Sequence, residues 1–339
     1  MKPPDDPTPS GDRRLARLMQ RALDRAGYAV FLASRLRTRD GLGDETAQAR
    51  LAEAAEAEGD RLIAALAPDP PRLWFTYHCF YKAPDLIGPR VAAALGMPYV
   101  VAEGTRARKR LTGPWAGFAA ASEAALDRAA VIFWLTERDR PALEAARPAG
   151  QRLVHLPPFA ALGEAAARPV STTGPLRLAA VAMMRRPDKL ASFAALAAAL
   201  GRLEGVDWRL TVAGGGPAEA ETRALLAPFG DRVTWAGRQD AREDVHAVYE
   251  ACDLFVWPGV NEGFGMVYLE AQAAGRAVVA EDRPGVREVV APSSALVPPG
   301  DADAFAFAIR RYAEDRAGLA AAGAAARAHM LARHGIEAA

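Results

Sequence analysis

Short runs of β-branched and aromatic residues alternate with long alanine-rich amphipathic segments along most of the 339 residues. Parallel strands joined by crossover helices give this alternation, because each helix returns the chain to the same end of the sheet. The pattern therefore predicts an α/β fold. Strands are expected at residues 28–34, 72–78, 98–103 and 130–136 in the first half, and at 176–182, 208–214, 233–237, 254–258 and 277–282 in the second.

The two halves are separated by residues 156–175, which are rich in proline, glycine, serine and threonine. We predict two doubly wound Rossmann-like domains at residues 1–160 and 161–315, followed by a helical tail at 316–339. Sheets of this kind bind ligands at the carboxyl ends of their strands. The binding site is accordingly expected where the two domains face each other across one cleft.

Composition limits the class of protein further. With 51% hydrophobic and 24% charged residues the chain is expected to be globular and soluble, and a net charge of +1 argues against a nucleic-acid partner. The two cysteines, Cys79 and Cys252, are predicted to be small buried residues in a reducing compartment. No apolar run is long enough to span a bilayer and no signal peptide is evident, which predicts a cytoplasmic protein; contact with the inner membrane face is left open.

The stretch at residues 258–275, PGVNEGFGMVYLEAQAAG, carries the most chemistry. An apolar strand enters a glycine-containing loop, and a helical pattern opens near Gly265, where unpaired N–H groups and the positive end of the helix dipole attract a diphosphate. Glu270 lies on the following helix, where its carboxylate is suited to two ribose hydroxyls, and Glu262 precedes the helix, where it is suited to hydroxyls of a sugar. A solvated Glu270 and a helix-entry Glu262 are the alternative interpretation.

The same stretch with its neighbours, YEACDLFVWP before and AGRAVVAEDRPGVREVV after, resembles the retaining glycosyltransferases of GT-B fold in family 4, also called group 1. Their signature is Glu, seven residues, Glu, followed by a small-residue turn and a buried strand. The resemblance is specific over residues 233–290 and loose before residue 170. It implies donor binding by a set of residues around this motif: Gly263, Phe264, Gly265, Met266, Val267 and Glu270, with Glu262 in a catalytic role. It also implies that the terminal helix at 316–339 packs back on the first domain.

A cation is needed near the departing diphosphate, because negative charge develops there when the sugar is lost. Lys189 is our candidate, since it stands where the resembled family has its lysine. Met183 stands where that family has an arginine, so either Arg185 or Arg186 supplies the second charge or the site relies on Lys189 alone. The glycine run at 213–217 implies close approach of a nucleotide to Gly214 and Gly215, with a tight turn as the alternative. The loop at 235–240 implies a contact from Arg238 to the base.

In the first domain, Gly11 lies in SGDRR, which resembles the family's glycine loop facing donor and acceptor. Relatives have a buried strand before that loop, whereas MKPPDDPTP contains four prolines, so we expect the natural chain to begin upstream of Met1. His78 is predicted to meet the acceptor, with a satisfied core histidine as the alternative. Where the family has a histidine near the reacting sugar, Glu103 or Arg106 stands instead.

Two further groups of residues allow different interpretations. RARKR at 106–110, with Trp115 and Phe118 beside it, is either a surface for an anionic acceptor or membrane, or a solvated loop. Asp301 and Asp303 form a D-x-D string that reads as a helix N-cap. We therefore expect no metal and no cofactor, the nucleotide sugar being a substrate.

The sequence as a whole predicts a retaining, metal-independent glycosyltransferase that transfers a sugar from a nucleotide-sugar donor to an acceptor hydroxyl on a glycan, lipid or small molecule. Two alternatives stay open: a sugar-nucleotide epimerase of the same fold, and a catalytically impaired nucleotide-binding relative. A Rossmann dehydrogenase is disfavoured, because no G-x-G-x-x-G opens a helix after a first strand.

Overall fold

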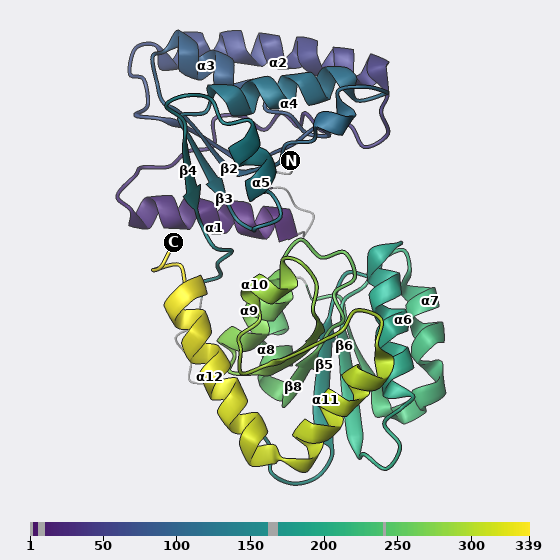
Figure 1. The fold of residues 1–339 in the computed structure, drawn as a ribbon. Coiled ribbons are helices and arrows are strands. Elements are labelled where there is room, and N and C mark those ends of the chain that lie inside the picture. The colour runs from purple at the N-terminus through teal and green to yellow at the C-terminus, as the bar shows by residue number, and fades with distance from the viewer. Residues whose placement is uncertain (1–2, 6–10, 162–168, 240–241) are drawn as a thin grey trace. The chain divides into compact units, whose positions relative to one another are not determined.

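The computed structural model describes residues 3–5, 11–161, 169–239 and 242–339 (Figure 1). The chain forms two compact units, Met1–Pro157 and Pro158–Ala339. Each unit has its own parallel sheet and its own hydrophobic core.

The amino-terminal unit is built on four parallel strands in the order β1-β2-β3-β4. Its core is formed by apolar side chains of strands and helices that exclude water from both sides of the sheet, among them Val91, Val101, Leu126 and Ile132, none of which is exposed. The elements are α1 (Gly11–Arg25), α2 (Glu45–Leu66), β1 (Trp74–Cys79), α3 (Gly88–Ala94), β2 (Tyr99–Gly104), η1 (Arg108–Arg110), α4 (Ala116–Arg128), β3 (Val131–Trp134), α5 (Arg140–Ala145) and β4 (Arg152–His155).

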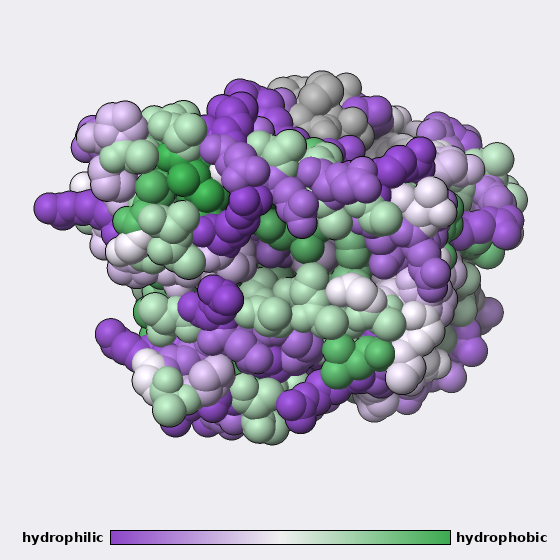
Figure 2. All heavy atoms as spheres, turned by 90° about the horizontal axis from the view of Figure 1, so that it is seen from above, coloured by the Kyte–Doolittle hydropathy of each residue, from purple (hydrophilic) through white to green (hydrophobic). Residues whose placement is uncertain are grey.

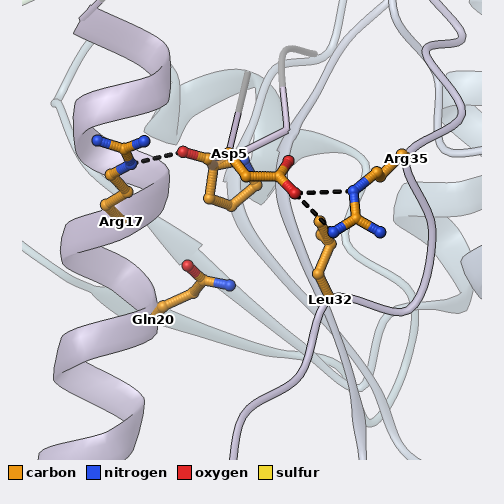
Figure 3. A pocket seen from close by; sticks show the side chains of 6 residues that line it. Asp5, Arg17, Gln20, Leu32 and Arg35 are labelled. Carbon is orange, nitrogen blue, oxygen red and sulfur yellow. Dashed lines mark hydrogen bonds and ion pairs between the residues drawn. The ribbon is translucent and has the colours of Figure 1, made fainter. Parts of the chain in front are cut away.

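Three of the four strands predicted here are confirmed as β1, β2 and β3. The strand predicted at residues 28–34 is wrong: this segment is neither helix nor strand. Ala33 packs on the core of the unit, whereas Phe31 is 55% exposed. Side-chain contacts hold it instead, since Ser34 Oγ donates to Glu58 and Arg35 pairs with Asp5 at 2.7 Å, beside a small pocket that is also lined by Arg17 (Figure 3).

The carboxyl-terminal unit is built on six parallel strands in the order β10-β9-β8-β5-β6-β7. This is the doubly wound order, in which the strand order reverses between β5 and β8. All five strands predicted for this half are present, and β10 was not predicted. The elements are β5 (Leu176–Val181), α6 (Asp188–Leu200), β6 (Trp208–Ala213), α7 (Glu219–Leu226), η2 (Ala227–Arg232), β7 (Val233–Gly237), α8 (Arg242–Ala251), β8 (Leu254–Val256), α9 (Met266–Ala273), β9 (Ala277–Glu281), α10 (Val286–Val289), β10 (Ala295–Val297), α11 (Ala302–Glu314) and α12 (Arg316–His334).

The terminal helix α12 packs against α9 and β9 of its own unit. Gly323 allows this close approach, because a Cβ there would lie 2.3 Å from the carbonyl oxygen of Gly275. The predicted return of residues 316–339 to the first domain concerns contact between the units and stays a prediction. The predicted N-cap at Asp301 is confirmed, since its carboxylate accepts a hydrogen bond from Ala304 N at 2.8 Å at the start of α11.

Both cysteines are buried, as predicted, and burial raises the pKa of each thiol to about 12. Within the part of the chain that the structure describes, no helix combines the length and the apolar character needed to cross a bilayer.

Candidate functional site

The site is centred on the switch point of the carboxyl-terminal sheet, where the connections that follow β5 and β8 run out from neighbouring strands. Lys189 lies in the first turn of α6, and Glu262 lies in the connection from β8 to α9. The Lys189 ammonium and the Glu262 carboxylate form an ion pair, with side chains 14% and 13% exposed. Two residues that are 73 positions apart in the sequence, both predicted to act on the donor, are thus in direct contact.

The buried indole of Trp257 contacts both members of this pair. Trp257, which follows β8 and is fully buried, donates from Nε1 to Glu262 Oε1 at 3.1 Å. Its ring centroid also lies 6.0 Å from Lys189 Nζ, within the range of a cation–π contact. The Glu262 carboxylate is therefore held by a neutral donor and a cation together.

The connection carrying Glu262 is tied to α6 at two further points. Val260 N donates to Ser192 Oγ at 2.9 Å, and Asn261 Nδ2 donates to Asp188 Oδ2 at 3.2 Å. Asn261 has a φ of +53°, a conformation that asparagine tolerates better than most residues. These contacts fix the position of the loop before any ligand binds, which is the arrangement that electrostatic binding of a developing charge requires.

No side chain caps the amino terminus of α9. Gly265 is the N-cap, with a φ of +81°. A Cβ at Gly265 would lie 2.6 Å from the Tyr268 ring, so this ring under the turn requires glycine, whereas a Cβ at Gly263 would meet no atom within 4 Å. The unused N–H groups of the first turn and the helix dipole make this a place for an anion.

Glu270 lies further along α9 and is 8% exposed. Its Oε2 accepts a hydrogen bond from the Tyr249 hydroxyl of α8 at 3.0 Å. The solvated surface glutamate that the sequence allowed as an alternative is therefore wrong. The other predicted residues of this helix start, Phe264, Met266 and Val267, are partly buried and pack on the core of the unit.

The glycine run after β6 has a structural reason of its own. A Cβ at Gly214 would lie 1.8 Å from the Ala182 carbonyl oxygen, and a Cβ at Gly216 would lie 2.4 Å from that of Met184. The two loops pack backbone to backbone, and Met184 N donates to Gly215 O at 2.9 Å. Gly215 has room for a Cβ, which would lie 3.5 Å from Arg238. Nucleotide contacts from Gly214, Gly215 and the exposed Arg238 stay predictions.

The loop between β5 and α6 carries the cations expected beside Lys189. Arg186 pairs with Glu221 of α7 at 2.6 Å, so its positive charge is already balanced by a carboxylate of the protein. Arg185 is exposed, and no side-chain hydrogen bond or ion pair holds it among the residues that the structure describes. Of the two, Arg185 is the better placed to supply the second positive charge, while Met183 is 38% exposed.

In the amino-terminal unit, β1 and β2 end at a second polar cluster. His78 and Glu103 both have a positive φ, +63° and +59°, and their side chains approach within 3.8 Å. His78 Nδ1 also lies 3.6 Å from Asp12 Oδ1, so the start of α1 at Gly11 reaches this edge of the sheet. Burial lowers the pKa of His78, but the two carboxylates outweigh it and the pKa is raised; burial raises the pKa of Glu103.

Arg106 is not a candidate for the sugar-positioning role. Its guanidinium is buried and pairs with Glu123 and, at 2.6 Å, with Asp127. Phe118 is likewise buried in the core, so neither residue belongs to an exposed basic surface. Of the two residues predicted to stand in place of the family's histidine, Glu103 is the one that lies at the carboxyl edge of the sheet beside His78.

Two residues that the sequence left out of the site hold its carboxylates, Tyr249 at Glu270 and Trp257 at Glu262. Both belong to the string YEACDLFVWP and are aromatic residues with a hydrogen-bond donor, which was the only signal available. Over the described residues there is no group of three or more His, Cys, Asp and Glu that could hold a metal ion.

Comparison with solved structures gives the fold class. Sucrose-phosphate synthase from Thermosynechococcus elongatus matches with a TM-score of 0.71 at 23% identity, covering 99% of this chain and 94% of that one. HepE of Anabaena, solved in complex with UDP and glucose, matches with a TM-score of 0.63 at 16% identity, covering 94% and 85%. Two α/β units with parallel sheets and this likeness define a protein of the GT-B fold.

Sequence comparison finds similarity to glycosyltransferases over the carboxyl-terminal unit. Residues 175–315 match the family model described as "Glycosyl transferases group 1". A GDP-mannose-dependent monoacylated alpha-(1-6)-phosphatidylinositol monomannoside mannosyltransferase of Corynebacterium glutamicum is 35% identical over 132 residues, 37% of this chain and 34% of the relative. A D-inositol 3-phosphate glycosyltransferase of Mycolicibacterium smegmatis is 40% identical over 126 residues, 34% and 28%. The matches span about a third of these curated relatives.

Proposed function

We propose that the protein is a retaining, metal-independent glycosyltransferase that transfers a sugar from a nucleotide-sugar donor to an acceptor hydroxyl. The observation that carries the proposal is the contact of Lys189 with Glu262 beside the uncapped start of α9. It brings one cation, one hydroxyl-binding carboxylate and a helix amino terminus to a single switch point. A sugar diphosphate presents the complementary groups: anionic oxygens and, next to them, vicinal hydroxyls.

Each residue then has a distinct task. Lys189 and the N–H groups at Gly265 neutralise the diphosphate as it departs, Glu262 accepts hydrogen bonds from the sugar, and Glu270, held by Tyr249, accepts them from the ribose. In this scheme the leaving phosphate takes the proton of the acceptor hydroxyl. The new glycosidic bond then forms on the same face of the sugar from which the bond to the phosphate breaks. His78 is assigned to the acceptor.

In this proposal, fixed positive charges of the protein take the place of a metal ion. Lys189, Arg185 and the dipole of α9 supply what a divalent cation would supply at a diphosphate. Turnover should be the same in EDTA and in added manganese. Loss of turnover in EDTA that manganese restores would remove this part of the proposal.

The direct test is nucleotide release from UDP-, GDP- and ADP-sugars, each incubated with and without candidate acceptors. Transfer requires both substrates and gives a product of the donor's anomeric configuration, which NMR reads. An epimerase consumes the donor with no acceptor present, and an impaired relative binds the nucleotide but releases none. Arg209→Met is a matched control for Lys189→Met, because Arg209 is an exposed cation on β6 of the same unit.

A further inference from the structure

Leu42 is the most exposed large apolar side chain of the described residues, with 89% of its surface accessible. A second leucine, Leu111, is 41% exposed and directly follows η1, which consists of three basic residues. Figure 2 shows one face of the molecule, on which hydrophilic side chains lie between groups of hydrophobic ones. A loop that contacts only water is not expected to expose leucines beside a run of cations, so this combination indicates an interaction surface.

The two segments that carry these leucines are packed together. Gly43, next to Leu42, has a φ of +79°, and a Cβ there would lie 2.8 Å from the side chain of Pro114. Leu42 N donates to Asp40 Oδ1 at 2.8 Å, and Trp115 Nε1 donates to the Asp40 carbonyl at 3.4 Å. The turn that projects Leu42 is therefore packed directly on the loop that carries Leu111.

Cations lie beside the Trp115 ring, against which this turn packs. Lys82 Nζ lies 4.9 Å from the centre of the Trp115 ring, and the Arg110 guanidinium lies 5.6 Å from it. Arg108 and Lys109 are exposed. The neighbouring acids are Asp40, which is buried and accepts from Leu42 N, Asp44 N and Gln48, and Asp44 and Glu45 at the start of α2. Glu123 also lies beside η1, where it accepts from Ala107 N, but it is paired with Arg106. The four cations therefore outnumber the three other acids.

We propose that Leu42, Leu111, Trp115, Lys82 and the cations of η1, together called the Leu42 face, dock on an anionic lipid bilayer. The occupant follows from the chemistry of the face. Interfacial sites combine Lys and Arg, which attract anionic headgroups, with leucine and tryptophan that enter the acyl boundary. A nucleic acid could bind the cations and stack on the indole, but it offers no apolar surface for the side chain of Leu42, which is 89% exposed.

The test is sedimentation of the full chain with vesicles of phosphatidylcholine alone and of phosphatidylcholine with 30% phosphatidylglycerol, at roughly 0.1 M salt. The chain should bind the second and not the first, and roughly 0.5 M salt should release it. Arg108→Glu/Lys109→Glu should weaken binding by about 30-fold or more, at about 1 kcal/mol for each cation near the surface. Leu42→Ser, which changes no charge, should weaken it by about 10-fold.

Arg147→Glu/Arg152→Glu is the matched control, because it makes the same change in net charge at exposed positions of the same unit, away from η1 and the Leu42 turn. It should bind as the parent does. Absence of binding by the parent, equal binding to both vesicles, an unchanged Leu42→Ser, or a control as weak as the double variant each overturn the proposal. The measurement uses no sugar donor, so it is independent of the proposed transfer activity. Thermal melting of each variant shows that it is folded.

Discussion

The roles of Lys189 and Glu262 are separable by nucleotide binding, although the two side chains are in contact. If Lys189 neutralises the diphosphate, Lys189→Met removes charge-assisted hydrogen bonds worth about 1.5–3 kcal/mol, which raises the Kd of a nucleoside diphosphate by about 10- to 150-fold. Both groups are mostly shielded from water, so the loss should be near the upper part of this range.

Glu262→Gln should act in the opposite direction on the same ligand. The substitution removes the carboxylate that occupies Lys189 in the ligand-free protein and removes a negative charge beside the phosphate site. The glutamine still accepts from Trp257 Nε1. A nucleoside diphosphate should bind about 5-fold more tightly, an energy of about 1 kcal/mol, whereas transfer from a sugar donor should fall.

Isothermal calorimetry with UDP and GDP, on the parent, both variants and the Arg209→Met control, measures these affinities directly. An unchanged Kd for Lys189→Met refutes its place at the phosphate. If Glu262→Gln weakens nucleotide binding as much as Lys189→Met does, then the pair is only a structural salt bridge and the division of roles is wrong.

Three further predictions concern single positions. Glu270→Gln should weaken nucleoside diphosphate binding by about 1–3 kcal/mol, and Tyr249→Phe by less, since the carboxylate stays; an unchanged Kd in calorimetry rules out the ribose role. Gly216→Ala should lower the melting temperature, because its Cβ would lie 2.4 Å from a backbone carbonyl oxygen at φ +150°; melting like the parent contradicts this. The raised pKa of His78 stabilises the fold below its ordinary value near 6.5 and loses this effect as pH rises through the raised pKa, so the gap in stability between parent and His78→Gln should be larger at pH 6 than at pH 9.

The sequence predicted best those strands that are buried on both faces. The strand at 254–258 is an unbroken apolar run, and a central parallel strand reads in just this way, so its place as β8 followed from composition. Residues 28–34 have the same β-branched and aromatic content, yet they form no strand. Propensity alone does not supply a neighbouring strand, and without one the backbone groups bond elsewhere.

The site was predictable in its parts and not in its contacts. Glu262 and Glu270 follow from a local motif, and Lys189 from its place after a strand. Their contacts with Trp257, Tyr249 and each other depend on which strands are neighbours, and the reversal of strand order between β5 and β8 is a property of the whole sheet. A Cβ at Gly285 would lie 1.7 Å from the Gly263 carbonyl oxygen, so this position requires glycine. The sequence does not show this requirement either.

The Lys189–Glu262 pair also bears on how the proposed enzyme tells its substrate from its product. A nucleoside diphosphate that draws Lys189 toward its phosphates leaves Glu262 with the Trp257 donor alone in a mostly buried position, which is unfavourable for a carboxylate. A complete sugar donor brings hydroxyl groups that replace the lost ammonium at Glu262, so the separation of the pair is compensated only when both ends of the ligand are present. The parent should therefore prefer a sugar nucleotide to the corresponding nucleoside diphosphate, and Glu262→Gln should lose that preference, because a neutral amide needs no replacement cation. The ratio of the two Kd values, measured with a non-hydrolysable donor analogue, isolates this effect from any general change in affinity.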